Sequence, residues 1–262
     1  MLRGLYSAAT GMDVHQVKVE SISNNLMNAS TPGYKKEEVI VQSFPEQLLI
    51  QQGGRRNKGG AASSNLSQQI GTMGSGVLLS GVVIDHSQGE VQETGNDTDI
   101  MINGPGFFTV QSVQPGEPER IFYTRNGSFR VDQEGYLTDA VGNRILGEVG
   151  QINVGSAKFK VSSDGKMEVD GTVVDTLRLI EFDDPGSLTK EGEGLFTAPP
   201  GGGRQAASTT VSQGFLEMSN VNVTDEMINL VSAMRTYEAN QRVIQTFDEI
   251  LSKSANQVGT IK

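Results

Sequence analysis

The chain has 262 residues, a formal net charge of −10, and neither cysteine nor tryptophan. This length is enough for about two domains, and the lack of cysteine excludes disulfides and thiolate metal sites. Residues 1–60 carry a charge balance of +2 and the remainder −12, so the acidic body argues against a nucleic-acid partner, which needs clustered positive charge.

The first predicted element is a helix from about Tyr6 to Asn28. Its apolar residues recur at alternating three- and four-residue steps, which places one narrow seam along a helix, as in a coiled coil. Gly11 weakens this helix without breaking it, and His15 is interpreted as an interface residue. The seam consists of Leu5, Ala8, Met12, His15, Val19, Ile22 and Leu26.

The end of this helix is rich in asparagine, with Asn24, Asn25 and Asn28 ahead of a stop and turn signal at Ser30–Gly33. One interpretation is a helix C-terminus whose side-chain amides act as caps. The other is a subunit contact in which these amides fix the register between helices.

The next segment is expected to lack regular structure for most of its length. Residues 34–44 alternate loosely and indicate an extended segment, and Pro45–Leu49 suggests one helical turn with proline at its first position. The Gly-rich stretch 53–81 is typical of a linker or long loop. Its basic cluster, Arg55, Arg56 and Lys58, is interpreted as solvated.

Short strands separated by turns are predicted from Val82 to about Val211. Asp164-Gly165 and Asp170-Gly171 lie between strand-like runs, which is the strongest short-range hairpin signal, and Asn126-Gly127 and Glu134-Gly135 give the same signal. The predicted strands are Phe107–Val110, Ile121–Thr124, Ser128–Val131, Lys158–Val161, Lys166–Val169, Thr172–Val174 and Leu177–Phe182.

A second long helix is predicted from Val221 to Val258, a run of 38 residues without glycine or proline. Thr224 is the expected N-cap, and Asp225 and Glu226 place negative charge in the first turn, where the helix dipole favours it. Its seam consists of Met227, Leu230, Met234, Tyr237, Gln241 and Ile244, continued by Leu251.

These elements predict an α+β chain in which long N- and C-terminal helices form a coiled-coil-like pair around a central antiparallel β-domain. The expected organisation is a terminal helical assembly domain (1–34 and 215–262), an extended linker or loop region (35–81) and a central β-domain (82–214). A chain with two apolar helical ends is suited to joining through those ends, so the pattern favours assembly over catalysis.

The residues that carry chemistry are sparse, and we predict no catalytic, cofactor-binding or metal site. The two histidines, His15 and His86, lie far apart in the sequence. Asp97 and Asp99 lack the remaining ligands of a calcium loop and are interpreted as a polar turn before a buried strand, Ile100–Ile102. The N-terminus lacks the apolar run of a signal peptide, and no window approaches the 18 apolar residues of a membrane span.

Three separated motifs resemble one protein family. The opening block LRGLYSAATGM with SISNNLMNASTPGYK resembles the start of bacterial flagellar rod and hook proteins. GPGFFTV and YTRNGSFRVDQEGYLTDAVGNRILG resemble the shared β-domain of that family, and SNVNVTDEMINLVSAMRTYEANQRVIQTFDEIL resembles its closing helix. The short total length is more similar to rod proteins, of the distal-rod type, than to the longer hook proteins.

The resemblance implies a structural subunit of the flagellar rod in the basal body, outside the cytoplasmic membrane. It implies export through the flagellar type III apparatus without a cleaved signal, self-association into a helical tube, and contact with other rod and hook proteins. It implies no enzyme activity, no cofactor, no nucleic-acid partner and no membrane span. The predicted assembly interface consists of Leu5, Met12, Val19, Ile22, Asn24, Asn25, Leu26, Asn28, Met227, Leu230, Met234, Tyr237, Asn240, Ile244 and Leu251.

Three alternatives stay open at the level of sequence. A hook protein of minimal length would need a bendable packing of the same elements. A secreted cell-surface binding module would be a stable monomer with ordered termini. An enzyme acting on cell-wall polysaccharide would need paired carboxylates in a cleft, about 5–9.5 Å apart.

Overall fold

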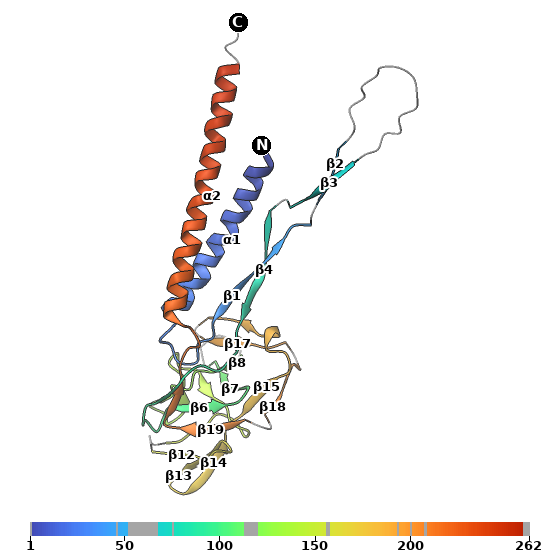
Figure 1. Cartoon of the computed structure of the whole chain (residues 1–262). Coiled ribbons are helices and arrows are strands. Elements are labelled where there is room, and N and C mark those ends of the chain that lie inside the picture. Colours follow the sequence, from blue (N-terminus) through green and yellow to red (C-terminus); the bar gives the residue numbers. More distant parts are fainter. Residues whose placement is uncertain are drawn as a thin grey trace, which may run out of the picture. The chain divides into compact units, whose positions relative to one another are not determined.

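The computed structural model describes residues 2–45, 47–51, 68–74, 76–112, 120–155, 158–192, 194–199, 201–206 and 209–258. Over these residues the chain is α+β, with two helices and many short antiparallel strands, which confirms the predicted class (Figure 1). It divides into two compact units. The helical unit comprises Met1–Ser23, Glu38–Val82 and Met227–Lys262, and the β-unit comprises Asn24–Glu37 and Val83–Glu226.

The helical unit contains most of both helices and two strand pairs. The last turn of the first helix and the first residues of the second belong to the β-unit. Strand β1 pairs with β4, and β2 pairs with β3 in an antiparallel ladder. The elements are α1 (Leu2–Met27), β1 (Glu37–Ser43), β2 (Gln47–Gln51), β3 (Gln68–Met73), β4 (Val77–Ile84) and α2 (Val223–Val258).

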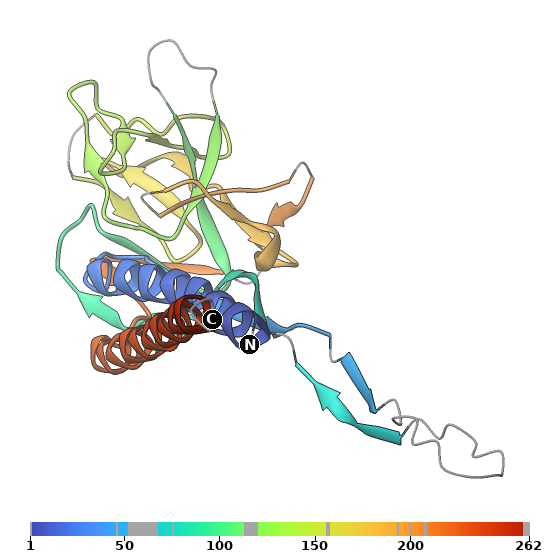
Figure 2. The same ribbon diagram turned by 90° about the horizontal axis from the view of Figure 1, so that it is seen from above.

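The two helices lie side by side and touch at two glycines of α1 (Figures 1 and 2). A Cβ atom added at Gly4 would lie 2.9 Å from the Phe247 ring, and one at Gly11 would lie 2.9 Å from the Asn240 amide. The contact moves seven residues forward in α1 and seven backward in α2, so this packing is antiparallel. Gly11 therefore makes room for a side chain of the partner helix, which offsets its cost in helix propensity.

Strands form in part of the segment that was predicted to be a linker. Residues 47–51 form β2 instead of a helical turn, and 68–73 and 77–84 form β3 and β4. Each of these strands pairs with a segment that is distant in the sequence. The glycine-rich composition of the segment alone therefore could not reveal the strand pairing that stabilises it. The basic cluster Arg55, Arg56 and Lys58 lies outside the described residues.

The β-unit is built on β7, which pairs with β8 along one edge and with β15 and β11 along the other. The predicted strands Ile121–Thr124 and Lys166–Val169 are found with the predicted ends, and Phe107–Val110 is one residue longer at each end. The strands are β5 (Val91–Glu93), β6 (Ile100–Asn103), β7 (Gly106–Gln111), β8 (Ile121–Thr124), β9 (Arg130–Val131), β10 (Leu137–Thr138), β11 (Arg144–Ile145), β12 (Lys160–Val161), β13 (Lys166–Val169), β14 (Thr172–Thr176), β15 (Leu179–Phe182), β16 (Thr189–Lys190), β17 (Leu195–Thr197), β18 (Gly203–Gln205), β19 (Thr210–Gln213) and β20 (Phe215–Glu217), with a 3₁₀ turn at Pro185–Ser187.

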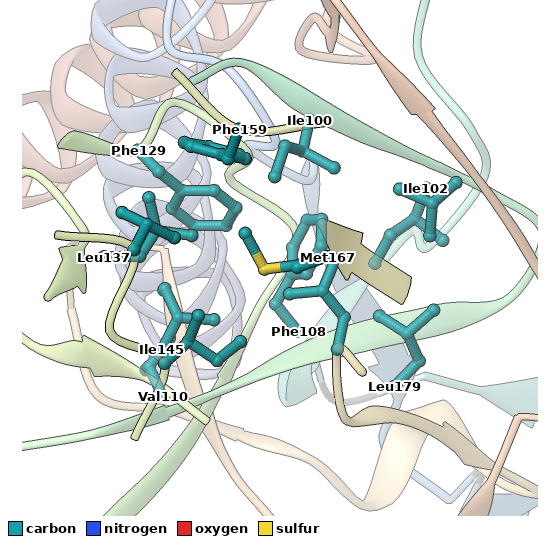
Figure 3. Packing of buried hydrophobic residues seen from close by; sticks show 14 of the residues in the cluster. Ile100, Ile102, Phe108, Val110, Phe129, Leu137, Ile145, Phe159, Met167 and Leu179 are labelled. Carbon is teal, nitrogen blue, oxygen red and sulfur yellow. The ribbon is translucent and has the colours of Figure 1, made fainter. Parts of the chain in front are cut away.

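The β-unit closes around its own hydrophobic core. Phe108, Leu137, Ile145 and Met167 are completely buried, and the Phe108 and Phe129 rings meet edge to face with centroids 4.9 Å apart (Figure 3). Aromatic and branched side chains in such a dense interior are the main source of stability of a domain of this size.

Three of the four predicted hairpin turns are confirmed. Asp164-Gly165 joins β12 to β13, Asp170-Gly171 joins β13 to β14, and Glu134-Gly135 joins β9 to β10. Asp170 and Gly171 both have positive φ, as this type of two-residue turn requires.

The prediction for Asn126-Gly127 is wrong, because β8 and β9 do not pair. Instead the Gly127 carbonyl accepts a hydrogen bond from the Ile100 amide at 3.0 Å, and a Cβ atom at Gly127 would lie 1.7 Å from the Ile100 carbonyl oxygen. The absence of a side chain at Gly127 therefore allows two backbone segments to lie close together.

No helix among the described residues is long and apolar enough to cross a membrane.

Candidate assembly site

The α2 helix carries a covered stripe and an exposed apolar stripe. The covered stripe recurs at alternating four- and three-residue steps and consists of Glu226, Leu230, Ala233, Tyr237, Asn240, Ile244 and Phe247, all buried or half-buried. The exposed stripe consists of Met227, Val231 and Met234, whose exposed fractions are 52%, 50% and 49%. Residues at steps of four and three share one face of a helix, so the exposed stripe forms one continuous surface.

The predicted seam of α2 mixes residues of both stripes. Leu230, Tyr237 and Ile244 belong to the covered stripe, whereas Met227, Met234, Gln241 and Leu251 are exposed. Beside the exposed stripe lies a groove of about 430 Å³ in the helical unit. It is lined by Gln16, Val19 and Glu20 of α1 and by Met234, Tyr237, Glu238 and Gln241 of α2.

The residues of the predicted α1 seam are buried or half-buried within the chain itself. Ile22 and Ala8 are buried, and Leu5, Met12, His15, Val19 and Leu26 are half-buried. Val14, which the predicted seam omits, is 6% exposed. The apolar face of α1 is therefore broader than a single coiled-coil seam.

The two-stranded ribbon of β1 and β4 exposes apolar side chains on both of its faces. Successive side chains of a strand point to opposite faces, and Ile40 and Val41 of β1 are 46% and 42% exposed. On β4 the exposed residues are Leu78, Leu79, Val82 and Val83. A two-stranded ribbon is marginally stable by itself, and this one carries more apolar surface than a solvated ribbon requires.

Asn25 serves the fold of the chain itself. Its side chain is completely buried, its amide donates to the Glu37 carbonyl oxygen at 2.9 Å, and its Oδ1 accepts from the Tyr34 hydroxyl at 3.1 Å and the Glu37 amide at 2.9 Å. These bonds tie the end of α1 to the start of β1, which corrects the interpretation of Asn25 as a subunit contact.

Asn24 and Asn28 fit the capping interpretation of the asparagine-rich run. The Asn28 amide donates to both the carbonyl oxygen and the Oδ1 of Asn24 at 2.9 Å, and its Oδ1 accepts from the Thr31 hydroxyl at 3.3 Å. Both side chains are only half-buried. They therefore stay partly accessible to other molecules.

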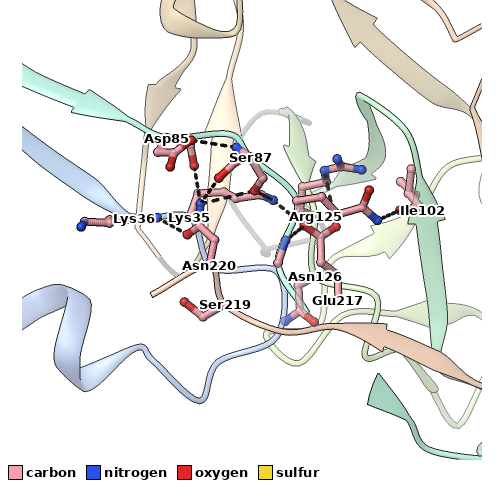
Figure 4. A network of polar contacts seen from close by, with 12 residues as sticks. Lys35, Lys36, Asp85, Ser87, Ile102, Arg125, Asn126, Glu217, Ser219 and Asn220 are labelled. Carbon is pink, nitrogen blue, oxygen red and sulfur yellow. Dashed lines mark hydrogen bonds and ion pairs between the residues drawn. The ribbon is translucent and has the colours of Figure 1, made fainter. Parts of the chain in front are cut away.

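A buried ionic cluster in the β-unit joins three distant parts of the sequence (Figure 4). Lys35, Arg125 and Glu217 are 2%, 5% and 2% exposed. Lys35 Nζ pairs with the Glu217 carboxylate and donates to the Ser87 carbonyl oxygen at 2.7 Å, while Arg125 Nε lies 3.8 Å from Glu217 Oε2. Removing the Glu217 carboxylate would leave Lys35 and Arg125 buried without an ion-pair partner among the described residues, which is strongly destabilising.

Burial lowers the pKa of both Lys35 and Arg125, because the charged forms lose hydration, and the Glu217 carboxylate acts in the opposite direction. Arg125 Nη2 also donates to the Gly104 carbonyl oxygen at 2.6 Å, and the Gly89 amide donates to Glu217 Oε1 at 3.1 Å. The cluster thus fixes several backbone segments at once.

Lys36 continues the connection to the first turn of α2. Its Nζ lies 2.7 Å from the Glu226 carboxylate, and its amide donates to Asn220 Oδ1 at 2.8 Å. The neighbouring Gly33 has φ of +70°, and a Cβ atom there would lie 2.4 Å from the Asn126 amide nitrogen. Two consecutive lysines and a required glycine therefore hold the exit from α1 against the segment that leads into α2.

His86 packs beside this cluster. Its ring lies 5.7 Å from both Phe107 and Phe196, measured between centroids. Burial lowers the pKa of His86, and the nearby charges of Lys35 and Arg125 lower it further. His86 is therefore a neutral, aromatic part of the packing at neutral pH.

Three family models match successive parts of the chain. The model described as flagella basal body rod protein matches residues 5–35, the flagellar hook protein FlgE/F/G D1 domain matches 101–169, and the flagellar basal body rod FlgEFG protein C-terminal matches 212–258.

Curated relatives match nearly the whole chain. The flagellar basal-body rod protein FlgG of Buchnera aphidicola subsp. Schizaphis graminum is 34% identical over 97% of this chain and 98% of that protein. FlgG of Bacillus subtilis is 31% identical over 98% of this chain and 99% of that protein. The flagellar hook-basal body complex protein FlhO of Bacillus subtilis is 30% identical over the full length of both.

The chain belongs to the flagellar basal-body rod protein family. As a member of this family it is a structural subunit of the flagellar rod. The matched ranges cover most of α1, the centre of the β-unit and α2, which are the regions that carry the three motifs recognised in the sequence.

Sequence reasoning missed the ionic cluster of this rod protein and the start of α2. Lys35, Arg125 and Glu217 are isolated charges in the sequence, and no short-range pattern marks them as partners. The N-cap of α2 is Asn222 and not Thr224, since Asn222 Oδ1 accepts from the Thr224 amide at 3.0 Å and the Asp225 amide at 3.4 Å. Asparagine is a better N-cap than threonine, so this signal was present.

Proposed function

We propose that this rod protein polymerises helically through its terminal helices into the torque-transmitting shaft of the basal body. The observation that carries the proposal is the exposed stripe of α2. A monomer that leaves Met227, Val231 and Met234 about half exposed on one helix face has an apolar surface suited to a neighbour. The β1–β4 ribbon supports the same conclusion with a second uncovered surface.

In this proposal α1 and α2 form a coiled-coil-like pair that neighbouring subunits complete. The contacts of Phe247 with Gly4 and of Asn240 with Gly11 repeat every seven residues and support heptad packing. The predicted interface residues on the exposed side are Met227, Met234 and Leu251. Contacts between identical subunits that do not close into a ring generate a helical filament.

The remaining expectations follow from the family and from this architecture. The chain would leave the cytoplasm through the flagellar type III export apparatus without a cleaved signal and would contact other rod and hook proteins. It would act as a structural element and not as an enzyme. Its relatives are named as rod and hook-basal body proteins, which supports this assignment.

The test places a charge on the exposed stripe. Met234→Asp is expected to prevent polymerisation of the purified full chain, measured by sedimentation and electron microscopy, because an assembled interface would have to bury the new carboxylate. The matched control is Ser232→Asp, which puts the same charge on an exposed position about 200° away around α2. Polymers of normal yield from Met234→Asp would contradict the proposal.

A short hook protein is the second candidate, because the matched D1-domain model is described for a hook protein. The two candidates differ in the mechanics of the polymer. Straight, stiff polymers in electron micrographs support the rod, and polymers that adopt smooth curvature support the hook.

A further inference from the structure

The groove between α1 and α2, named here the helical groove, combines apolar side chains with two carboxylates. Val19 of α1 and Met234 and Tyr237 of α2 supply the apolar part of its lining, and Glu20 and Glu238 supply the acidic part. Met234 also belongs to the exposed stripe, so the groove is continuous with the surface that the proposed function gives to a neighbour. An occupant of matching chemistry has an apolar side chain with a cation beside it.

The two carboxylates of the helical groove are available to such a cation. Both side chains are exposed, and neither Glu20 nor Glu238 forms an ion pair with any residue that the structure describes. Glu20 Oε1 accepts one hydrogen bond, from Gln16 Nε2 at 3.1 Å. The groove therefore presents two negative charges that its own chain does not neutralise by direct contact.

The start of α1 carries a pair of side chains with this chemistry. Tyr6 is 64% exposed, the largest exposed fraction among the large hydrophobic side chains described for the helical unit. Arg3 is exposed, lies three residues earlier and so shares a face of α1 with Tyr6. The next acidic residue after Arg3 in the sequence is Asp13, and Arg3 forms no ion pair among the described residues.

Two other exposed cations of the helices have a large apolar neighbour within one turn, and both fit less well. Arg235 follows Val231 of the exposed stripe, and a contact through the same face of α2 on both copies closes as a dimer instead of extending a filament. Lys253 follows Ile250, but Glu249 lies four residues before Lys253 and offsets its charge. The pair at the start of α1 is therefore the best match that the helical unit offers.

The spacing on α1 gives the register of the contact. Tyr6, Asp13 and Glu20 recur every seven residues, so they share one face of the helix. The lining of the helical groove includes Glu20 but not Asp13, which selects a displacement of two heptads, about 21 Å along the helix. A second copy that is displaced by this distance, with its α1 in the same direction, brings the start of α1 beside the groove.

We propose that the start of α1 of one copy docks in the helical groove of the next copy, with the Tyr6 ring against the apolar lining and Arg3 paired with Glu20 and Glu238. The two surfaces differ, so the contact is heterologous, and its repetition extends a filament along the helices. The inference rests on the proposed self-assembly, and it names the segment of the second copy that fills the groove.

Reversal of the charges tests the ion pair. Arg3→Glu and Glu238→Arg are each expected to raise the critical concentration for polymerisation of the full chain about tenfold, because each places like charges together. The chain with both changes has opposite charges again and should polymerise near the critical concentration of the unmodified chain. Arg178→Glu, at an exposed position of the β-unit, changes the net charge as Arg3→Glu does and should not rescue Glu238→Arg.

The outcomes separate this inference from the proposed function. Rescue of Glu238→Arg by Arg3→Glu alone supports both. If the unmodified chain polymerises and the double variant does not recover, or if Arg178→Glu rescues equally well, the docking is overturned and self-assembly stands. If the unmodified chain forms no polymers, self-assembly and the docking are both contradicted.

The aromatic ring has a test of its own. Tyr6→Ala is expected to raise the critical concentration about tenfold, because the contact then no longer buries the ring. Met27→Ala is the control, since Met27 is 76% exposed on the same helix and lies outside the lining of the groove. Equal critical concentrations for these two variants would overturn the docking of Tyr6.

Zero-length cross-linking tests the register. Arg3→Lys keeps the cation and supplies an amine, and a carbodiimide joins that amine to a carboxylate in contact, taking up the water that amide formation releases. Isotope-labelled and unlabelled chains are polymerised together, so mass spectrometry identifies links between copies. Links from position 3 to Glu20 or Glu238 of another copy are expected. Links to Asp13 instead, or polymers without any link from position 3, would overturn the docking.

Discussion

The helical unit and the β-unit treat their apolar side chains differently. In the β-unit Phe108, Leu137, Ile145 and Met167 are completely buried within one chain. In the helical unit α2 and the β1–β4 ribbon leave large apolar residues about half exposed. The core of the β-unit is therefore complete in the monomer, whereas the helical unit has apolar surfaces that a neighbour can complete.

The largest effect should come from deleting a ring of the β-unit core. Phe108→Ala is expected to lower the free energy of unfolding by about 3–5 kcal/mol, because it removes a completely buried ring and leaves a cavity. Met234→Ala on α2 is expected to change it by less than about 0.5 kcal/mol while weakening polymerisation. Urea denaturation of the two monomeric variants measures both changes. Equal losses in the free energy of unfolding would contradict the predicted difference between the two units.

The ionic cluster gives the next largest effect. Glu217→Gln should destabilise the β-unit by about 3 kcal/mol, since the buried Lys35 and Arg125 would lose the carboxylate that pairs with both of them. The measurement is again the free energy of unfolding in urea. Lys190→Met, which removes the ion pair with Glu37 where both side chains are partly exposed, is the milder control. A loss no larger than that of the control would show that the cluster is not essential.

The start of α2 offers a smaller and more local test. Asn222→Ala should cost about 1 kcal/mol, because it removes the acceptor for the Thr224 and Asp225 amides. Thr224→Ala should cost clearly less, although the sequence pointed to Thr224 as the cap. Hydrogen exchange of the amides in the first turn of α2 compares the two variants. A larger loss of protection in Thr224→Ala than in Asn222→Ala would contradict the assignment of Asn222 as the N-cap.

Acid should weaken the β-unit through His86, with the smallest effect of the series. The pKa of His86 is below its ordinary value of 6.5, so the unfolded chain binds this proton more readily. The stability that neutral His86 contributes is complete above pH 6.5 and is lost as the pH falls below it toward the lowered pKa. The groups around the ring are Lys35, Arg125 and Asp85. His86→Leu should show a smaller loss between pH 7 and pH 5, and unchanged pH profiles would contradict this role.

Local periodicity predicted the helices and most hairpins because those features depend on nearby residues. Apolar residues that recur at three- and four-residue steps predicted α1 and α2. Asp170-Gly171 predicted its turn because these residue types accept the positive φ that the turn requires. The β2–β3 pair and the Lys35–Glu217 contact were not predictable in this way, because each joins segments that are distant in the sequence.

At the candidate assembly site, too, the sequence predicted local features and missed those that depend on contacts between distant segments. Helical spacing located the apolar residues of α2, yet spacing alone did not separate the covered Leu230 and Tyr237 from the exposed Met227 and Met234. Which face is covered depends on where α1 packs, and the two glycines that receive Phe247 and Asn240 decide this. Asn25 was assigned to assembly because burial by its own chain is invisible in the sequence.

Hydrogen–deuterium exchange of the full chain as monomer and as polymer tests the central claim most directly. We expect β7 and its neighbours to be protected equally in both states, whereas α2 and the β1–β4 ribbon should gain protection only in the polymer. Protection of α2 in the monomer equal to that of β7, with no change on polymerisation, would contradict the claim that neighbours complete the helical unit.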